Sequence, residues 1–402
     1  MEWLTLKEYE AQFFSINTIT TEMGERIWEN YGSKVTVEFP SPKTNEHWLL
    51  KSQGWVGYIP INPDMGLYLA PKVSLSNIFR MLEYAYELKS FQFLEGWMEC
   101  ETLQEFYDRL AYLLSQKIQQ RLKKGIYHEY QQQVDRLPYV RGKWNVHDML
   151  RRPLDTGVVC EFDEHLSDIE DNQILLWSLK KIRQSELCSE HVQKHIGRAY
   201  RALQSQVSLV PLAANKCRNR SYNRMNVDYQ PLHVLCQLFL EHMGPHHQTG
   251  EQRMLPFIVN MAQLFERFVA QFLSEYLPEK YELKVQERVP IGERSSLYMD
   301  IDLVIYDVAT GEVKWVIDTK YKTAKLPSQQ DIYQAVSYAT SKHCAEAILV
   351  YPTKHIQSFD EQIGDIRVRS VCFDLEGILE ETGQQLLRMI FDSHENEQPM
   401  TF

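Results

Sequence analysis

Two neighbouring segments of the chain carry acidic side chains inside strand patterns that are otherwise apolar. The first is Met299 to Asp302, within a predicted strand over residues 298–306, and the second is Val316 to Lys322. A turn over residues 308–312 joins them into a hairpin. Carboxylates buried in a sheet must be paired or bind a metal, so two carboxylates and a lysine on adjacent strands predict a compact site for a divalent cation and a phosphate. Such a site predicts cleavage of nucleic acid.

The alternation of side chains along the strands indicates which acids meet. Asp300 and Asp302 share one face of their strand, and Asp318 and Lys320 share one face of the next. A hairpin with a tight turn sets Asp300 roughly opposite Thr319, between Asp318 and Lys320. Asp302 lies one pair deeper and is the second choice. A shift of one or two residues at the turn would reverse this ranking, so both aspartates stay candidates.

The chemistry of these residue types favours magnesium, with Mn²⁺ as a possible substitute. Mg²⁺ prefers oxygen ligands and keeps several waters. Two carboxylates, the Thr319 backbone carbonyl and a phosphate oxygen would supply them, while Lys320 would orient the attacking water or stabilise charge on the phosphorane. Alternatively, the acids face solvent on an edge strand and Asp318 and Lys320 form a surface pair. Val316 and Ile317 precede Asp318 and favour the buried site.

Composition limits the classes of protein that fit. The chain has 402 residues, 44% of them hydrophobic, which predicts two or three packed domains. No apolar run is long enough to span a membrane, and no secretory signal is visible. The seven cysteines are scattered without a Cys-x-x-Cys pair, which favours a reducing cytoplasm.

The formal charge of −11 is unusual for a protein that holds DNA by neutralising phosphates. We therefore expect DNA contacts to be local or to belong largely to a partner. Solvated surface is the alternative for any charge run. The candidate DNA-binding residues are Lys216, Arg218, Arg220, Arg224 and Lys322.

The pattern of elements predicts a multidomain α+β or α/β protein. Residues 1–160 are expected to form a β-rich domain with helices, and residues 161–254 a helical connecting region. Residues 255–402 show the order helix, strands, helix, strand, which indicates a mixed sheet flanked by helices.

A family resemblance rests on several motifs in order. Glu266 within Leu-Phe-Glu-Arg-Phe, Asp300, the run Asp318-Thr319-Lys320, and the helix from Gln334 to Tyr338 together resemble the PD-(D/E)xK nuclease superfamily. The sequence is most similar to the McrC family, the nuclease subunits of McrBC-type modification-dependent restriction systems, and the likeness covers most of the chain. One departure is Met299, at the position where the superfamily name implies proline.

The resemblance implies roles for these residues. It makes Asp300, Asp318 and Lys320 catalytic, with Asp300 and Asp318 as metal ligands, to which the oxygen preference of Mg²⁺ adds the Thr319 carbonyl. Glu266 matches an acidic residue of the first helix in many members, so it would belong to the catalytic site and either bind a metal or hold that site together. Supporting roles fall to a set of three, Gln334, Tyr338 and Asp302. The Gln-x-x-x-Tyr pair would contact the DNA backbone or order the lysine, since residues at i and i+4 share one helix face. Ordinary packing is the alternative for the acid and for the pair.

The resemblance also implies a partner. McrC-like proteins bind a hexameric AAA+ GTPase, McrB, through an N-terminal finger-like domain and stimulate its GTP hydrolysis, while that motor recognises methylated cytosine and translocates DNA. We expect the finger-like domain within residues 1–160 and the inserted element around Trp55 to Tyr68. No Gly-x-x-x-x-Gly-Lys-Ser/Thr motif is present, so we expect no nucleotide on this chain. An autonomous repair or recombination nuclease and a non-catalytic GTPase-activating adaptor remain alternatives.

Overall fold

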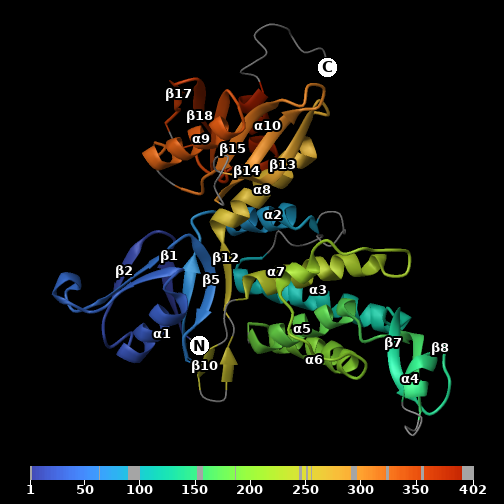
Figure 1. Ribbon diagram of the computed structural model, residues 1–402. Coiled ribbons are helices and arrows are strands. Elements are labelled where there is room, and N and C mark those ends of the chain that lie inside the picture. The colour runs from blue at the N-terminus through green and yellow to red at the C-terminus, as the bar shows by residue number, and fades with distance from the viewer. Residues whose placement is uncertain are drawn as a thin grey trace. The chain divides into compact units, whose positions relative to one another are not determined.

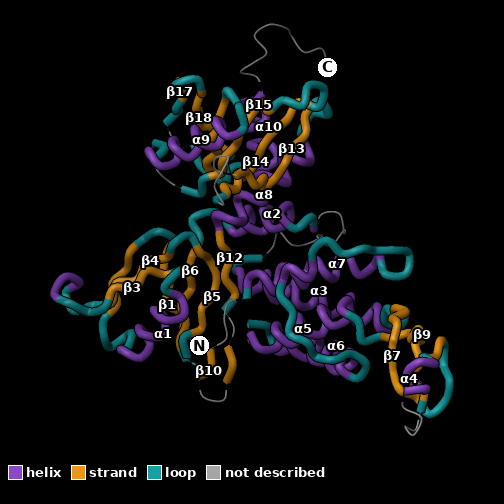
Figure 2. Tube along the Cα trace, viewed as in Figure 1, coloured by secondary structure: helices purple, strands orange, loops and turns teal. Residues whose placement is uncertain are grey.

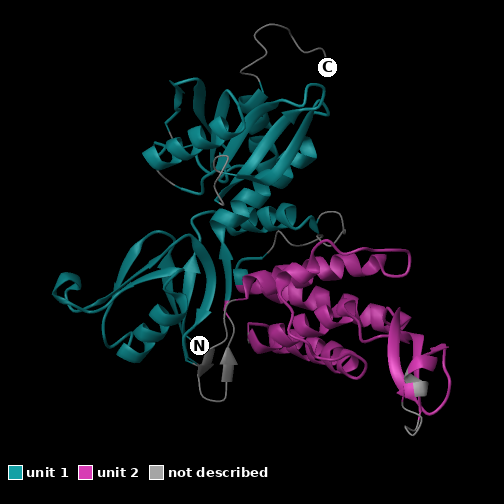
Figure 3. Cartoon of the chain, in the orientation of Figure 1, with its two compact units in different colours: residues 1–103, 257–402 teal, residues 104–256 magenta. Residues whose placement is uncertain are grey.

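The computed structural model divides the chain into two compact units (Figure 3). Unit 1 combines Met1–Leu103 with Phe257–Phe402, and unit 2 is Gln104–Pro256. The described residues are 2–62, 64–88, 100–151, 157–185, 187–243, 247–249, 252–254, 256–290, 297–322, 326–354 and 357–391. This division differs from the three consecutive segments expected from the sequence, because the first and last parts of the chain pack together.

The N-terminal part of unit 1 contains two sheets. A four-stranded sheet has the order β1-β6-β5-β12, with β1 parallel to β6 and the other pairs antiparallel. A three-stranded sheet has the order β2-β4-β3. The strands of the two sheets are β1 (Glu2–Lys7), β2 (Ala11–Phe14), β3 (Val35–Glu38), β4 (Trp48–Ser52), β5 (Trp55–Pro60), β6 (Met65–Ala70) and β12 (Phe257–Asn260). The helical elements are α1 (Thr21–Tyr31), the short η1 (Pro42–Thr44) and α2 (Leu75–Ala85).

One strand from the second half of the chain completes this N-terminal sheet. β12 pairs antiparallel with β5, and Ile258 joins the buried cluster that contains Leu6 and Leu67. The predicted inserted element, Trp55 to Tyr68, is therefore part of the core, since β5 lies between two neighbouring strands and Val56 is fully buried. β5 therefore offers little free surface of its own, and the inserted element stays a prediction.

The C-terminal part of unit 1 is a six-stranded mixed sheet in the order β13-β14-β15-β16-β18-β17 (Figure 1). The strands are β13 (Tyr281–Pro290), β14 (Tyr298–Asp307), β15 (Val313–Thr319), β16 (Glu346–Tyr351), β17 (Asp360–Ile363) and β18 (Ile366–Cys372). The strands β13, β14 and β15 form an antiparallel meander, and β16 continues the sheet parallel to β15. A mixed sheet flanked by helices is the architecture expected for this region.

Helices cover this sheet on both faces. The helices are α8 (Met261–Tyr276), α9 (Gln329–Ser341) and α10 (Leu379–Phe391). Val316 packs in one cluster with Ala335 of α9, whereas its neighbour Trp315 contacts Phe391 of α10. Because side chains alternate along a strand, α9 and α10 lie on opposite faces of the sheet. A capping box starts α9, in which the side chains of Ser328 and Asp331 satisfy backbone donors of the first turn.

Unit 2 is mainly helical and carries a three-stranded sheet, β7-β9-β8 (Figure 2). Its helical elements are α3 (Leu103–Lys124, in unit 2 from Gln104 onward), α4 (Val146–Arg151), α5 (Glu170–Ser185), α6 (Glu190–Gln204), η4 (Ala214–Cys217), η5 (Val227–Tyr229) and α7 (Gln230–His242). Its strands are β7 (Glu129–Leu137), β8 (Lys143–Trp144), β9 (Val158–Leu166), β10 (His247–Thr249) and β11 (Gln252–Met254). No helix among the described residues has the length and apolar character needed to cross a membrane.

Candidate functional site

The register between β14 and β15 decides which aspartate meets Asp318. At the hairpin end Tyr306 pairs with Val313, as the expected register requires. A bulge then shifts the pairing by one residue, so that Leu303 pairs with Ile317. Continued along the strands, this register places Asp302 beside Asp318, and no longer Asp300 opposite Thr319. The register expected from the turn alone is therefore wrong by one residue.

Hydrogen bonds support the shifted register. The backbone N–H and the hydroxyl of Thr319 donate to Asp302 Oδ2 at 2.8 and 3.0 Å. Asp300, by contrast, has a side chain that is 69% exposed, and Arg288 Nε lies 4.0 Å from its Oδ1. The structure thus brings Asp302 to the site and leaves Asp300 on the surface.

Asp318 is a carboxylate buried at the end of β15. It is 1% exposed, Lys320 Nζ lies 2.7 Å from its Oδ2, and its Oδ1 has no hydrogen-bond donor within the described residues. Burial raises the pKa of Asp318 to about 7; Lys320 opposes this shift and Asp302 adds to it. A buried carboxylate oxygen without a donor is costly unless a cation or proton binds it.

Helix α9 orders the lysine. Lys320 Nζ donates to Gln334 Oε1 at 2.9 Å, and Gln334 Nε2 donates to the Tyr338 hydroxyl at 2.6 Å. Burial lowers the pKa of Lys320, but Asp318 outweighs that effect, so the pKa is raised overall and the amine stays charged. Of the two roles expected for the Gln-x-x-x-Tyr pair, contact with the lysine is present in this structure.

Glu266 on α8 approaches the same site. Its pKa is raised by burial and then by Asp302, whose negative charge disfavours ionisation, while Lys320 acts in the opposite direction. Gln286 Nε2 donates to Glu266 Oε1 at 2.9 Å. The structure therefore gathers Glu266 with Asp302 and Lys320, although these residues are far apart in sequence.

Gln286 is a residue of this site that the sequence did not reveal. It lies inside β13 with a φ of 49°, in the left-handed region that residues other than glycine rarely adopt. Its neighbours Val285 and Glu287 pair with Leu303 and Ile301, which leaves Gln286 unpaired in the ladder. Such strain clusters at functional sites, but no sequence motif marks it.

The donor set suits a magnesium ion. No group of three or more His, Cys, Asp or Glu side chains among the described residues is arranged to hold a metal by itself. Asp302 and Asp318 would therefore be joined by backbone oxygen, phosphate and water, and Mg²⁺ prefers such a set because it retains several waters. The donor-free Oδ1 of Asp318 is the atom that most needs a cation.

Most of the predicted DNA-binding residues form ion pairs instead. Lys216 pairs with Glu170 at 3.3 Å, Arg218 with Glu241, and Lys322 of unit 1 with Asp331 at 2.7 Å. Arg224 lines an open hollow on the surface of unit 2.

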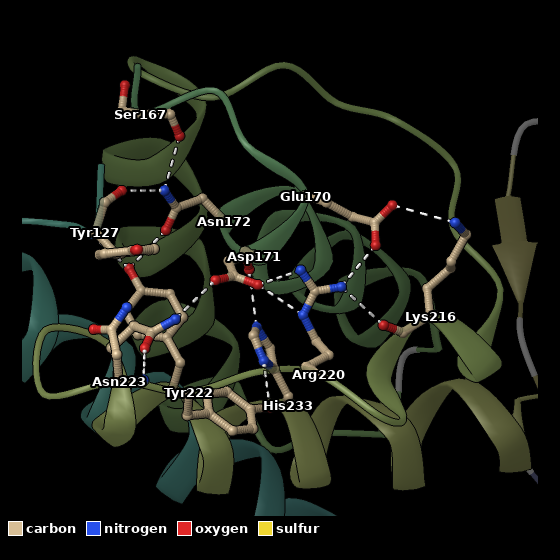
Figure 4. Close-up of polar contacts among 12 residues, drawn as sticks. Tyr127, Ser167, Glu170, Asp171, Asn172, Lys216, Arg220, Tyr222, Asn223 and His233 are labelled. Atoms are coloured by element: carbon tan, nitrogen blue, oxygen red, sulfur yellow. Dashed lines mark hydrogen bonds and ion pairs between the residues drawn. The ribbon is translucent and has the colours of Figure 1, made fainter. Parts of the chain in front are cut away.

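Arg220 belongs to a buried polar network in unit 2. Its guanidinium contacts Glu170 at 2.6 Å and Asp171, whose backbone carbonyl lies 3.0 Å from His233 Nε2 (Figure 4). The Asn172 side chain also donates to the Tyr127 carbonyl at 2.8 Å. These contacts hold the segment before α7 against α5. Arg220 therefore has a structural role in the helical unit.

These features define a multidomain α+β protein with a buried carboxylate–lysine site in a mixed sheet. Residues 50–352 match the model of a family described as "McrBC 5-methylcytosine restriction system component". Because the match spans most of the sequence, the chain belongs to this family.

One solved structure shows a similar fold over nearly the whole chain. One chain in a refined half-complex of the tetradecameric assembly of Thermococcus gammatolerans McrB AAA+ hexamers with bound McrC is similar over 97% of this chain and 100% of its own length. Its sequence identity is 17% and the TM-score is 0.57. A chain of the cryo-EM structure of the T. gammatolerans McrBC complex has 18% identity over 69% of this chain and 89% of its own length, with a TM-score of 0.44. The resemblance to the McrC family is confirmed. No curated protein sequence matches the chain significantly.

Proposed function

We propose that this chain is the Mg²⁺-dependent DNA endonuclease subunit of a McrBC-type restriction complex, with a site of the PD-(D/E)xK type. The observation that carries the proposal is Asp318, a buried carboxylate with a donor-free oxygen beside Asp302 and Lys320. Buried acids with strongly perturbed pKa values beside a positioned lysine are typical of catalytic sites rather than of structural cores. Membership of a restriction family supports DNA as the substrate.

The roles of the residues follow from their placement. Asp318, Asp302 and the Thr319 carbonyl would hold the ion, with Glu266 nearby. When bound there, Mg²⁺ would supply Lewis-acid chemistry toward a phosphate oxygen. Lys320, held by Gln334, would orient the attacking water or stabilise negative charge on the phosphorane.

A partner is part of the proposal because the chain offers little positive surface. Its net charge is −11, and three of its predicted DNA-binding residues are engaged in ion pairs in unit 2. We propose that an AAA+ GTPase hexamer of the McrB type recognises methylcytosine DNA and translocates it, and that this chain stimulates its GTP hydrolysis. The T. gammatolerans structure, in which McrB hexamers bind McrC, supports this arrangement for a related fold.

The sheet β7-β9-β8 is a better candidate for the partner contact than the buried β5. Tyr130 and Val134 of β7 are 71% and 67% exposed, and Tyr139 in the connection to β8 is 60% exposed. Val134 also lines one hollow together with Trp144 and Val146. Exposed apolar side chains that adjoin one another mark interaction surfaces. We expect Val134→Ser combined with Trp144→Ser to reduce stimulation of GTP hydrolysis while Mn²⁺ binding at the carboxylate site is retained.

Plasmid cleavage tests the proposal. The purified chain is assayed with Mg²⁺, with and without the AAA+ partner and GTP, on cytosine-methylated and unmethylated DNA. Cleavage that needs partner, GTP and methylation, and that is lost in Asp318→Asn, supports the restriction subunit. Cleavage by the chain alone would identify an autonomous nuclease, and an unchanged Asp318→Asn variant would identify an adaptor without catalysis.

Two further variants separate the candidate aspartates. Asp302→Asn should abolish cleavage because it removes a carboxylate beside Asp318, whereas Asp300→Asn should retain most of it. The opposite result would restore the register expected from the sequence.

A further inference from the structure

Glu8 is a buried carboxylate that the proposed chemistry does not use. It follows β1, is 0% exposed, and has an Oε1 without a hydrogen-bond partner among the described residues. Its Oε2 accepts from the Lys72 backbone N–H at 3.3 Å and from the Tyr321 hydroxyl at 3.3 Å. Burial raises the pKa of Glu8, while these two donors oppose the shift. A carboxyl group in such a place costs stability, so its contacts need a reason.

Tyr321 connects this carboxyl to the site. It is the residue directly after Lys320, its side chain is buried, and its ring lies 6.0 Å from the ring of Phe265, the residue before Glu266. Its carbonyl also accepts a hydrogen bond from the Tyr9 hydroxyl at 3.4 Å. The link between β1 and β2 in the N-terminal part of unit 1 therefore contacts both the side chain and the backbone of the segment that leaves β15.

A second connection joins the same two parts of unit 1. β12 belongs to the N-terminal sheet and runs directly into α8, which carries Glu266. The N–H of Met261 in the first turn of α8 donates to the Gly54 carbonyl at 3.0 Å. The acid on α8 and the lysine after β15 are thus both tied to the N-terminal sheet.

We propose that Glu8 and Tyr321 are positioning residues through which the N-terminal sheet holds Lys320 in register with Asp318. This inference rests on the proposed nuclease function. Without the Tyr321 hydroxyl, the end of β15 keeps its pairing with β16. It loses the hydrogen bond to Glu8, the residue that follows β1. Lys320 would then exchange between Asp318 and solvent, which lowers turnover without removing a ligand or a DNA contact.

The test uses the full chain, with partner and GTP if cleavage requires them. Tyr321→Phe removes only the hydroxyl, Glu8→Leu removes the acceptor, and Glu8→Gln keeps an acceptor oxygen. Tyr281→Phe is the matched control, because Tyr281 pairs with Asp307 at the other end of β13 and contacts Trp315 and Phe391. We expect Tyr321→Phe and Glu8→Leu each to lower kcat about tenfold with KM for DNA unchanged, the size of one lost hydrogen bond.

Two comparisons distinguish positioning from general damage. The double variant should be no slower than either single variant, because both remove the same contact. Glu8→Gln should return kcat to within about twofold of the wild type, since it restores an acceptor of equal size. Losses that multiply in the double variant, or a Glu8→Gln chain as slow as Glu8→Leu, would overturn the inference.

A readout independent of cleavage separates this inference from the proposed function. The rate at which acetic anhydride acylates Lys320, followed by mass spectrometry, reports how tightly Asp318 and Gln334 hold the amine. It should rise several-fold in Tyr321→Phe and Glu8→Leu and stay unchanged in Tyr281→Phe. Unchanged acylation in both variants refutes the link even if the wild type cuts DNA. A wild type that cuts no DNA refutes the nuclease, while altered acylation would still support the link.

Discussion

Replacing Asp318 by asparagine should make the chain more stable at alkaline pH. The folded protein holds this carboxyl almost completely buried, which raises its pKa from the ordinary value of 3.8 to about 7. A carboxyl whose folded pKa is raised adds stability below its unfolded pKa, and that contribution is lost as pH rises through the folded pKa. Asparagine has nearly the same shape and does not ionise, so the variant escapes this loss.

The magnitude follows from proton linkage. Between about pH 5 and about pH 8.5 the unfolded carboxyl is already ionised, whereas the folded one loses its proton near pH 7. The unfolding free energy of the wild type falls by about 1.4 kcal/mol for each pH unit between pH 5 and the folded pKa. Over this window the loss is therefore about 2–3 kcal/mol. The variant also removes the ion-pair partner of Lys320, while Asp302 and Asp331 continue to favour the charged amine, so that cost should change little between the two pH values.

Urea unfolding at the two pH values, with EDTA present, measures the effect. The unfolding free energy of Asp318→Asn relative to the wild type should rise by about 2–3 kcal/mol from pH 5 to pH 8.5. Asp300→Asn is the matched control, since that side chain is largely exposed and should show no such trend. Added Mg²⁺ should stabilise the wild type at pH 8.5 more than Asp318→Asn. A difference that does not change with pH would refute the assignment of a buried, proton-binding Asp318.

Other substitutions test the supporting contacts. Gln334→Ala should lower the cleavage rate about tenfold at unchanged DNA affinity, because the Lys320 amine loses an acceptor at 2.9 Å. Weaker DNA binding instead would indicate that Gln334 contacts the substrate. Gln286→Gly should keep the unfolding free energy within about 1 kcal/mol of the wild type, because glycine tolerates the positive φ but gains chain entropy when unfolded. It should nevertheless slow cleavage, because Glu266 loses the hydrogen bond from Gln286. Equal loss of stability and activity would contradict this. Arg220→Leu should destabilise the fold by about 3 kcal/mol in urea unfolding, because Asp171 stays buried without its cation, and a stable variant with weakened DNA binding would restore its predicted role.

The placement of Arg220 shows how sequence alone misjudges charged residues. A short run of basic residues before α7 looks like a surface for phosphate, and its spacing contains nothing that indicates acidic partners. Those partners, Glu170 and Asp171, precede Arg220 by 50 and 49 positions in the sequence. Only the packing of α5 against the segment before α7 brings the charges together, so the network could not be predicted locally.

The two aspartates of β14 show a similar limit. The alternation of side chains correctly placed Asp300 and Asp302 on one face of a strand next to β15. The choice between them depended on one extra residue in the hairpin, because a single bulge moves every later pair by one position. The left-handed backbone of Gln286 in the neighbouring strand is equally invisible in the sequence.

The sequence by itself predicted the residues of the candidate site and determined the class of the fold. Strand and helix periods act within a few residues, so they placed Asp318 and Lys320 on one face and Gln334 and Tyr338 on one helix. The tertiary structure decided which distant segments meet: β12 completes the N-terminal sheet, and the Tyr321 hydroxyl reaches a carboxyl 313 positions away. Such contacts arise from burial and register summed over the whole unit, which no local pattern contains.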